Sequence, residues 1–143
     1  MLVAIIGESC VGKSTLAERL KGELKASVYT GKDYLRLAKN EAIAKKLFMK
    51  KLSDAVSGEH IIYVIAEADQ LALLPDGAVK VLVTADLEII LERFSALMRG
   101  TLPTPVKQML ERKHGCFDNL KCDYHIHNGE NLEEVCGELL NRL

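Results

Sequence analysis

Residues Gly7-Glu8-Ser9-Cys10-Val11-Gly12-Lys13-Ser14 have the spacing G-x-x-x-x-G-K-S, which is the pattern of a phosphate-binding P-loop. Successive backbone N–H groups of such a loop form a concave anion site at a helix N-terminus, where the helix dipole also favours phosphate. The lysine of the motif reaches the β- and γ-phosphates, and its Ser hydroxyl is a ligand of Mg²⁺. The sequence therefore predicts an ATP and Mg²⁺ site in which the nucleotide is bound by Gly7, Glu8, Ser9, Cys10, Val11, Gly12, Lys13, Ser14 and Thr15.

The segments on either side of this motif have the character that a P-loop needs. Leu2–Ile6 is an apolar run that predicts a buried strand ending at Gly7, and Ser14–Leu20 reads as the first turns of a helix. Strand, glycine-containing loop and helix in this order are the context in which the motif binds phosphate. We therefore interpret the segment as a P-loop and not as a chance Gly-Lys-Ser sequence.

Two acidic residues follow the third predicted strand, at residues 60–66, and either of them is suited to support Mg²⁺. Glu67 and Asp69 come directly after that strand, and carboxylate oxygens are preferred ligands of Mg²⁺. In a parallel sheet the strand ends meet at one edge, so this acid would lie near Ser14. The sequence leaves the choice between Asp69 and Glu67 open.

Cationic side chains gather in the region 93–115, which has the layout of a mobile lid. Arg93 and Arg99 lie on a predicted helix, Arg112 and Lys113 lie on the next one, and residues 100–105 between them form a loop rich in Gly and Pro. Phosphoryl transfer needs cations around the transferring group, and lid segments often supply them. Arg99, at the entrance of this segment, is predicted to act together with Lys13 in catalysis.

The segment after the second predicted strand is the candidate site for the phosphate acceptor. Asp33 is suited to orient an acceptor hydroxyl or to accept its proton, and Arg36 is suited to hold an acceptor phosphate or carboxylate. A zinc site is a separate possibility, but the spacings of the candidate ligands lack the paired short turns of structural zinc sites. Those candidates are His114, Cys116, Cys122, His125 and His127.

The rest of the chain alternates strand and helix patterns. Further strands are predicted at 26–30, 60–66, 79–84 and 124–127, and helical patterns at 33–56, after Asp86, from Thr104 to near 115, and after Asn131. Asp86 and Thr104 are expected to be N-caps, and Asn131 with Glu134 is expected to form a capping box. These elements predict one α/β P-loop NTPase domain over residues 1–143, with a five-stranded, mostly parallel sheet and helices on both faces.

Composition limits the classes of partner. The chain has 143 residues, 48% hydrophobic and 27% charged, with a net charge of −1. A nearly neutral chain has no broad basic surface for nucleic acid or anionic lipid, and no stretch has transmembrane length. No signal peptide is recognised, so we expect a cytoplasmic protein, a monomer or homodimer, with a small-molecule partner.

Several segments together resemble the nucleoside-monophosphate-kinase-like branch of P-loop kinases, whose fold is adenylate-kinase-like. Within this branch the resemblance is strongest to cytidylate kinases and dephospho-CoA kinases. The stretch 74–85 and Glu92-Arg93 are similar to "P-D-A-x-x-K-I-F-L-T-A" and the following "E-R" of cytidylate kinases. Residues 122–134 are similar to "A-D-Y-V-I-D-N-x-G-x-L-E-E-L" of dephospho-CoA kinases. The resemblance implies that Arg93 lines the adenine site, that Arg99 and Arg112 are lid arginines, and that Asp33 is the acid on the acceptor side.

The chain also departs from these families on the acceptor side. Cytidylate kinases have "G-R-D" after the third strand, where this chain has Glu67-Ala68-Asp69, and their insert that grips CMP has no counterpart of comparable length. The leading interpretation is a Mg²⁺–ATP-dependent kinase for a nucleotide-like or other small metabolite. The alternatives are a nucleotide-dependent binding or regulatory protein without an acceptor site, and a simple NTPase.

Overall fold

A computed structural model describes residues 1–143. It contains one sheet of five strands in the order β2-β3-β1-β4-β5, and every pairing is parallel. The strands are β1 (Leu2–Ile6), β2 (Ser27–Thr30), β3 (Ile61–Ile65), β4 (Val79–Thr84) and β5 (Tyr124–His127). Ile6 at the end of β1 is paired with Ile65 and with Leu82, so the central strands end at nearly the same level. The predicted fold class is confirmed.

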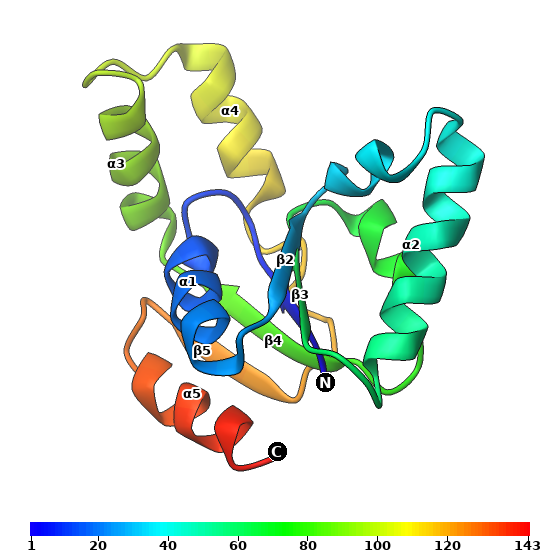
Figure 1. The fold of residues 1–143 in the computed structure, drawn as a ribbon. Coiled ribbons are helices and arrows are strands. Elements are labelled where there is room, and N and C mark those ends of the chain that lie inside the picture. Colours follow the sequence, from blue (N-terminus) through cyan, green and yellow to red (C-terminus); the bar gives the residue numbers. More distant parts are fainter.

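Helices cover both faces of the sheet (Figure 1). On one face lie α1 (Lys13–Leu24) and α5 (Leu132–Leu140), and on the other lie the short 3-10 helix η1 (Asp33–Leu37) and α2 (Glu41–Ala55). Val3 and Ile5 of β1 pack into the first of these cores, and the alternate residues of β1 pack into the second. All five residues of β1 are buried, as expected for a central parallel strand.

The core on the α2 face is built around one phenylalanine. The ring centroid of Phe48 lies 5.0 Å from those of Tyr29 and Tyr34 and 4.9 Å from that of Tyr63. Phe48 and Tyr63 are fully buried. Aromatic pairs at these spacings contribute beyond the apolar area that they bury. This cluster joins η1, α2, β2 and β3, and it therefore fixes the segment that carries the predicted acceptor residues.

The pair α3 (Leu87–Leu97) and α4 (Thr104–Lys113) projects beyond the strand ends (Figure 1). The connection from β3 to β4 contains only the 3-10 helix η2 (Ala68–Leu73). A cleft of about 490 Å³ is lined by residues along β4 and β5 and in the segment before β5, including Thr84, His125 and His127. None of the helices is long and apolar enough to cross a membrane.

Several local expectations need correction. The helix expected over 33–56 is interrupted at 38–40, because Asn40 caps α2 and its side-chain oxygen accepts from the Ile43 N–H at 3.1 Å. Asp86 and Asn131 do occupy N-cap positions, but neither side chain caps its helix. The Asn131 amide donates to the carbonyl of His125 instead, so the predicted capping box does not form. Pro103, and not Thr104, is the N-cap of α4.

Candidate nucleotide site

The P-loop has the backbone conformation that an anion site requires. Gly12 has φ +105°, in the left-handed region, and no side chain caps the first turn of α1 that follows it. The N–H groups of that turn are therefore available to an anion. A Cβ on Gly7 would lie 2.4 Å from the carbonyl oxygen of Val83 and 2.8 Å from a methyl group of Val11. Only glycine allows the loop to leave β1 this close to β4.

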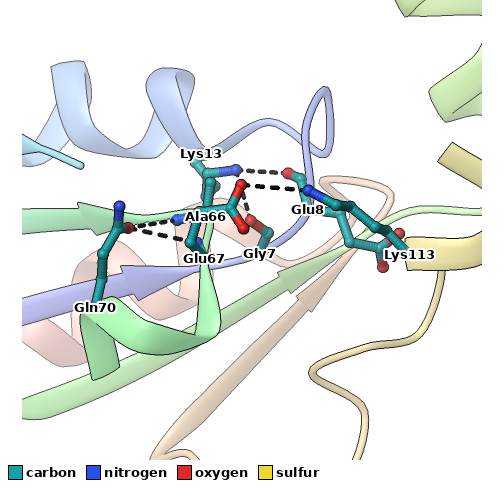
Figure 2. Close-up of polar contacts among 7 residues, drawn as sticks. All are labelled: Gly7, Glu8, Lys13, Ala66, Glu67, Gln70 and Lys113. Carbon is teal, nitrogen blue, oxygen red and sulfur yellow. Dashed lines mark hydrogen bonds and ion pairs between the residues drawn. The ribbon is translucent and has the colours of Figure 1, made fainter. Parts of the chain in front are cut away.

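Lys13 points back across the loop. Its Nζ donates to the carbonyl oxygens of Gly7 at 2.7 Å and Glu8 at 2.5 Å (Figure 2). Burial lowers the pKa of this ammonium from 10.5 to about 8, while Cys10 and Glu8 act in the opposite direction. A half-buried cation held only by neutral carbonyls is poorly compensated, so its position favours the binding of a phosphate.

The remaining P-loop residues line the loop at different depths. Val11 is buried, Cys10 is half-buried, and Ser9, Ser14 and Thr15 are exposed. Burial raises the pKa of the Cys10 thiol, against the opposing charges of Lys13 and Arg93. The hydroxyls of Ser14 and Thr15 are therefore open to a ligand, whereas Val11 is part of the core.

Glu8 connects the P-loop to the end of α4. Its carboxylate accepts from the backbone N–H of Gly115 at 3.0 Å, and its other oxygen lies 3.1 Å from Nδ1 of His114. Only 10% of the Glu8 side chain is exposed. The sequence places Glu8 in the motif but gives no indication of these contacts, because the partner residues lie more than 100 positions away.

The two candidate metal carboxylates have different environments. Glu67 lies 3.3 Å from the Nζ of Lys113, which reaches across from α4 (Figure 2). The Asp69 side chain is exposed and makes no hydrogen bond or ion pair. Gln70, which is buried, accepts from the N–H groups of Ala66 and Glu67 and thereby fixes the turn after β3. Glu67 is therefore already neutralised, whereas Asp69 is free.

Asp33 and Asp69 lie near a shared neighbour. The hydroxyl of Tyr63 donates to the carbonyl of Gly31 at 2.8 Å, and Asp33 accepts from the N–H of Thr30 at 2.9 Å. Burial raises the pKa of Tyr63, and the charges of Asp69 and Asp33 add to this effect. The predicted acceptor acid and one predicted metal ligand therefore occupy the same neighbourhood at the ends of β2 and β3.

The predicted arginines are spread over a wide region. Arg93 of α3 donates to the carbonyl of Cys10 at 3.0 Å and so contacts the P-loop. Arg36 lies over the ring of Tyr29, 5.3 Å from its centroid. Arg99 is exposed, has φ +61°, and makes no side-chain hydrogen bond, since it follows α3 at the far tip of the projecting pair. Arg112 is likewise exposed.

Two cavities flank the P-loop. One of about 280 Å³ is lined by Lys13, Ser14, Glu18 and Thr30, among others, on the side of β2. The other, of about 210 Å³, lies on the side of β5 between Arg93 and Gly129, and it has mainly apolar walls. Glu18 and Thr30 were not assigned to the site from the sequence. The only signal for Glu18 was its position one helical turn after Ser14, which places both side chains on the same face of α1.

The oxygen groups of the site fit Mg²⁺ and a nucleoside triphosphate. The Ser14 hydroxyl and the carboxylates of Asp69 and Glu67 are hard oxygen donors, and Mg²⁺ is usually held by one or two carboxylates together with phosphate oxygens and water. No group of three or more His, Cys, Asp or Glu side chains in the chain is arranged to hold a metal by itself. This finding includes the His and Cys residues between 114 and 127.

The chain matches no protein-family model. It also matches no curated protein sequence. Solved structures do match along nearly the whole chain. A shikimate kinase from Acinetobacter baumannii in complex with shikimate has a TM-score of 0.64 at 13% identity, covering 98% of this chain and 93% of that one. A gluconokinase from Sinorhizobium meliloti 1021 has a TM-score of 0.59 at 14% identity, covering 98% and 89%.

A third structure is that of the YorR protein from Bacillus subtilis in complex with phosphorylated GDP, with a TM-score of 0.61 at 22% identity, covering 99% and 95%. The chain shares the fold of small-molecule P-loop kinases. At these identities the likeness concerns the fold alone, so the narrower resemblance to cytidylate and dephospho-CoA kinases stays a prediction.

Proposed function

We propose that the protein is a Mg²⁺–ATP-dependent kinase that transfers the γ-phosphoryl group to a small metabolite. The observation that carries this proposal is the Lys13 ammonium, held at the P-loop by two carbonyl oxygens and poorly compensated there. In such a site, catalysis is mainly positioning and neutralisation of charge. Lys13 binds the phosphate oxygens, and Arg99 approaches the same group when the α3–α4 pair closes.

The other residues take complementary roles. Ser14 and one of the carboxylates Asp69 and Glu67 hold Mg²⁺, which when bound neutralises charge on the phosphates. Asp33 orients the acceptor hydroxyl or takes its proton, and Arg36 holds an anionic group of the acceptor. Arg93 lines the cavity of about 210 Å³, which receives the base of the nucleotide.

The test is Mg²⁺-dependent ADP release from ATP in the presence of a panel of acceptors. The panel contains nucleoside monophosphates, nucleosides, dephospho-CoA, shikimate and gluconate, and Lys13→Ala is measured in parallel. Release that one acceptor stimulates, and that is lost in Lys13→Ala, supports the kinase. Rapid release without any acceptor would instead indicate a simple NTPase.

A nucleotide-dependent binding protein is the second candidate. The observation that favours it is the composition of the turn after β3, where Glu67 and Asp69 supply only negative charge and Glu67 is tied to Lys113. A turn whose own charged side chains are acidic, and whose neighbouring cation Lys113 is already paired, is poorly suited to an anionic acceptor. A flat acceptor panel, with ATP binding retained in calorimetry, would favour this candidate over the kinase.

A further inference from the structure

A pair of reciprocal hydrogen bonds joins the start of α3 to the loop that follows β5. The backbone N–H of Asp86 donates to Oδ1 of Asn128 at 3.0 Å, and Nδ2 of Asn128 donates to Oδ2 of Asp86 at 3.0 Å. The Asn128 backbone has φ +52°, and its N–H donates to the carbonyl of Thr84 at 2.9 Å. Asn is among the few residues that tolerate this conformation.

Two histidines extend this contact along the end of the sheet. Nε2 of His127 lies 3.1 Å from the remaining carboxylate oxygen of Asp86, and its Nδ1 lies 2.8 Å from Oγ1 of Thr84. The same Oγ1 lies 2.7 Å from Nε2 of His125. The hydrogen bond from Asn128 lowers the pKa of the Asp86 carboxyl, and His127 acts in the same direction. Asp86 is therefore held as a carboxylate with both oxygens in use.

This contact lies next to the cavity on the β5 side of the P-loop. That cavity is lined by Arg93, which stands on α3 about two turns after Asp86, and by Gly129, the neighbour of Asn128. The distance between these two lining residues depends on where α3 begins relative to the loop 128–131. Asp86 uses its carboxylate for this contact and does not cap its own helix α3. Its hydrogen bonds instead hold the start of α3 against the loop 128–131.

We propose that Asp86 and Asn128 are positioning residues for the base of the bound nucleotide, acting as a clamp that sets the width of the cavity between Arg93 and Gly129. The clamp touches no phosphate-binding residue. It therefore contributes to the affinity for a nucleotide and leaves the affinity for its phosphate chain unchanged. The inference rests on the proposed function in so far as the cavity is assigned to a nucleotide base.

The test uses two probes, the non-hydrolysable ATP analogue AMP-PNP and inorganic tripolyphosphate, each with Mg²⁺, in calorimetry. Asn128→Asp places two carboxylates face to face, and we expect roughly tenfold weaker AMP-PNP binding, the scale of a lost hydrogen bond to a charged group. Tripolyphosphate affinity should stay unchanged. In the double variant Asp86→Asn/Asn128→Asp, the amide nitrogen introduced at position 86 faces the carboxylate introduced at position 128. The amide oxygen at position 86 still faces His127, so AMP-PNP affinity should return.

Three results would overturn the clamp. They are equal weakening of both probes in Asn128→Asp, failure of the double variant to restore AMP-PNP binding, and wild-type protein that binds AMP-PNP no better than tripolyphosphate. If Asn128→Asp does not fold, as judged by circular dichroism, Asn128→Gly replaces it, because glycine tolerates the φ of +52° and removes both side-chain hydrogen bonds to Asp86; AMP-PNP binding equal to that of the wild type would then overturn the clamp. Because binding is measured without turnover, a flat acceptor panel would refute the kinase and leave this result standing.

Discussion

Replacing Lys13 by methionine should remove function and change stability in a direction that depends on pH. The Lys13 ammonium is largely desolvated, and lowering its pKa from 10.5 to about 8 corresponds to a penalty of about 3 kcal/mol on the folded protein at pH 7. Methionine has a similar length and no charge. It avoids this penalty, but it loses the two hydrogen bonds to Gly7 and Glu8, together worth about 2 kcal/mol.

The sign follows from proton binding. The folded pKa of Lys13 lies below the unfolded value, so between pH 8 and pH 10.5 the unfolded chain holds more protons and the wild type gains stability as pH rises. By pH 10 the penalty has fallen to less than about 1 kcal/mol. Lys13→Met should therefore be slightly more stable than wild type at pH 7. By pH 10 the wild type should have gained about 2 kcal/mol of unfolding free energy relative to the variant.

The assay is urea denaturation of both proteins at pH 7 and pH 10, with Lys107→Met as the matched control. Lys107 is exposed on α4 and its side chain makes no hydrogen bond or ion pair, so its variant should differ from wild type by the same amount at both pH values. The reasoning would be refuted if the difference in unfolding free energy between Lys13→Met and wild type did not change with pH, or if the variant gained stability relative to wild type as pH rises. Either result would show that Lys13 carries its charge in the folded state without penalty.

Three further changes test the packing and the metal site. Gly7→Ala forces a Cβ to within 2.4 Å of the Val83 carbonyl, so it should lower the free energy of unfolding by about 2 kcal/mol and abolish ATP binding; unchanged urea denaturation and calorimetry would contradict this. Phe48→Ala should cost about 3–5 kcal/mol in urea denaturation, and a cost under about 1 kcal/mol would show that the aromatic cluster is not central. Asp69→Asn should raise the Mg²⁺ concentration for half-maximal activity more than Glu67→Gln, because Glu67 is already ion-paired; the reverse order would assign the metal to Glu67.

Much of the fold follows from local signals in the sequence. The apolar run at Leu2–Ile6 and the continuous run at 61–65 are typical of strands buried on both faces, and they form the adjacent strands β1 and β3. The pattern over 33–56 was less informative. Apolar spacing continued through residues 38–40, and only the capping hydrogen bond of Asn40 separates η1 from α2.

The site was predictable where the motif is contiguous and unpredictable where contacts span the chain. Lys13 and Ser14 are identified by spacing alone. In contrast, Asp86 read as a helix cap because local sequence cannot show that Asn128, 42 residues later, competes for its carboxylate. Lys113 was visible as one cation of a lid, but its pairing with Glu67 depends on how α4 is folded against the strand ends.

The contacts at the base of the α3–α4 pair indicate where a lid would bend. The loop at residues 100–105, which suggested a hinge, lies between the two helices at the far end of the pair, so bending there would not move the pair relative to the P-loop (Figure 1). At the base, the Lys113–Glu67 pair is half-exposed on both sides and contributes at most about 1 kcal/mol, so it separates easily. Glu8 is shielded and binds both His114 and Gly115, which makes that contact more persistent. Movement of the pair should therefore begin between Lys113 and Gly115, whose φ of +81° marks the turn out of α4. Lys113, the cation paired with Glu67, is the first group that this movement would displace.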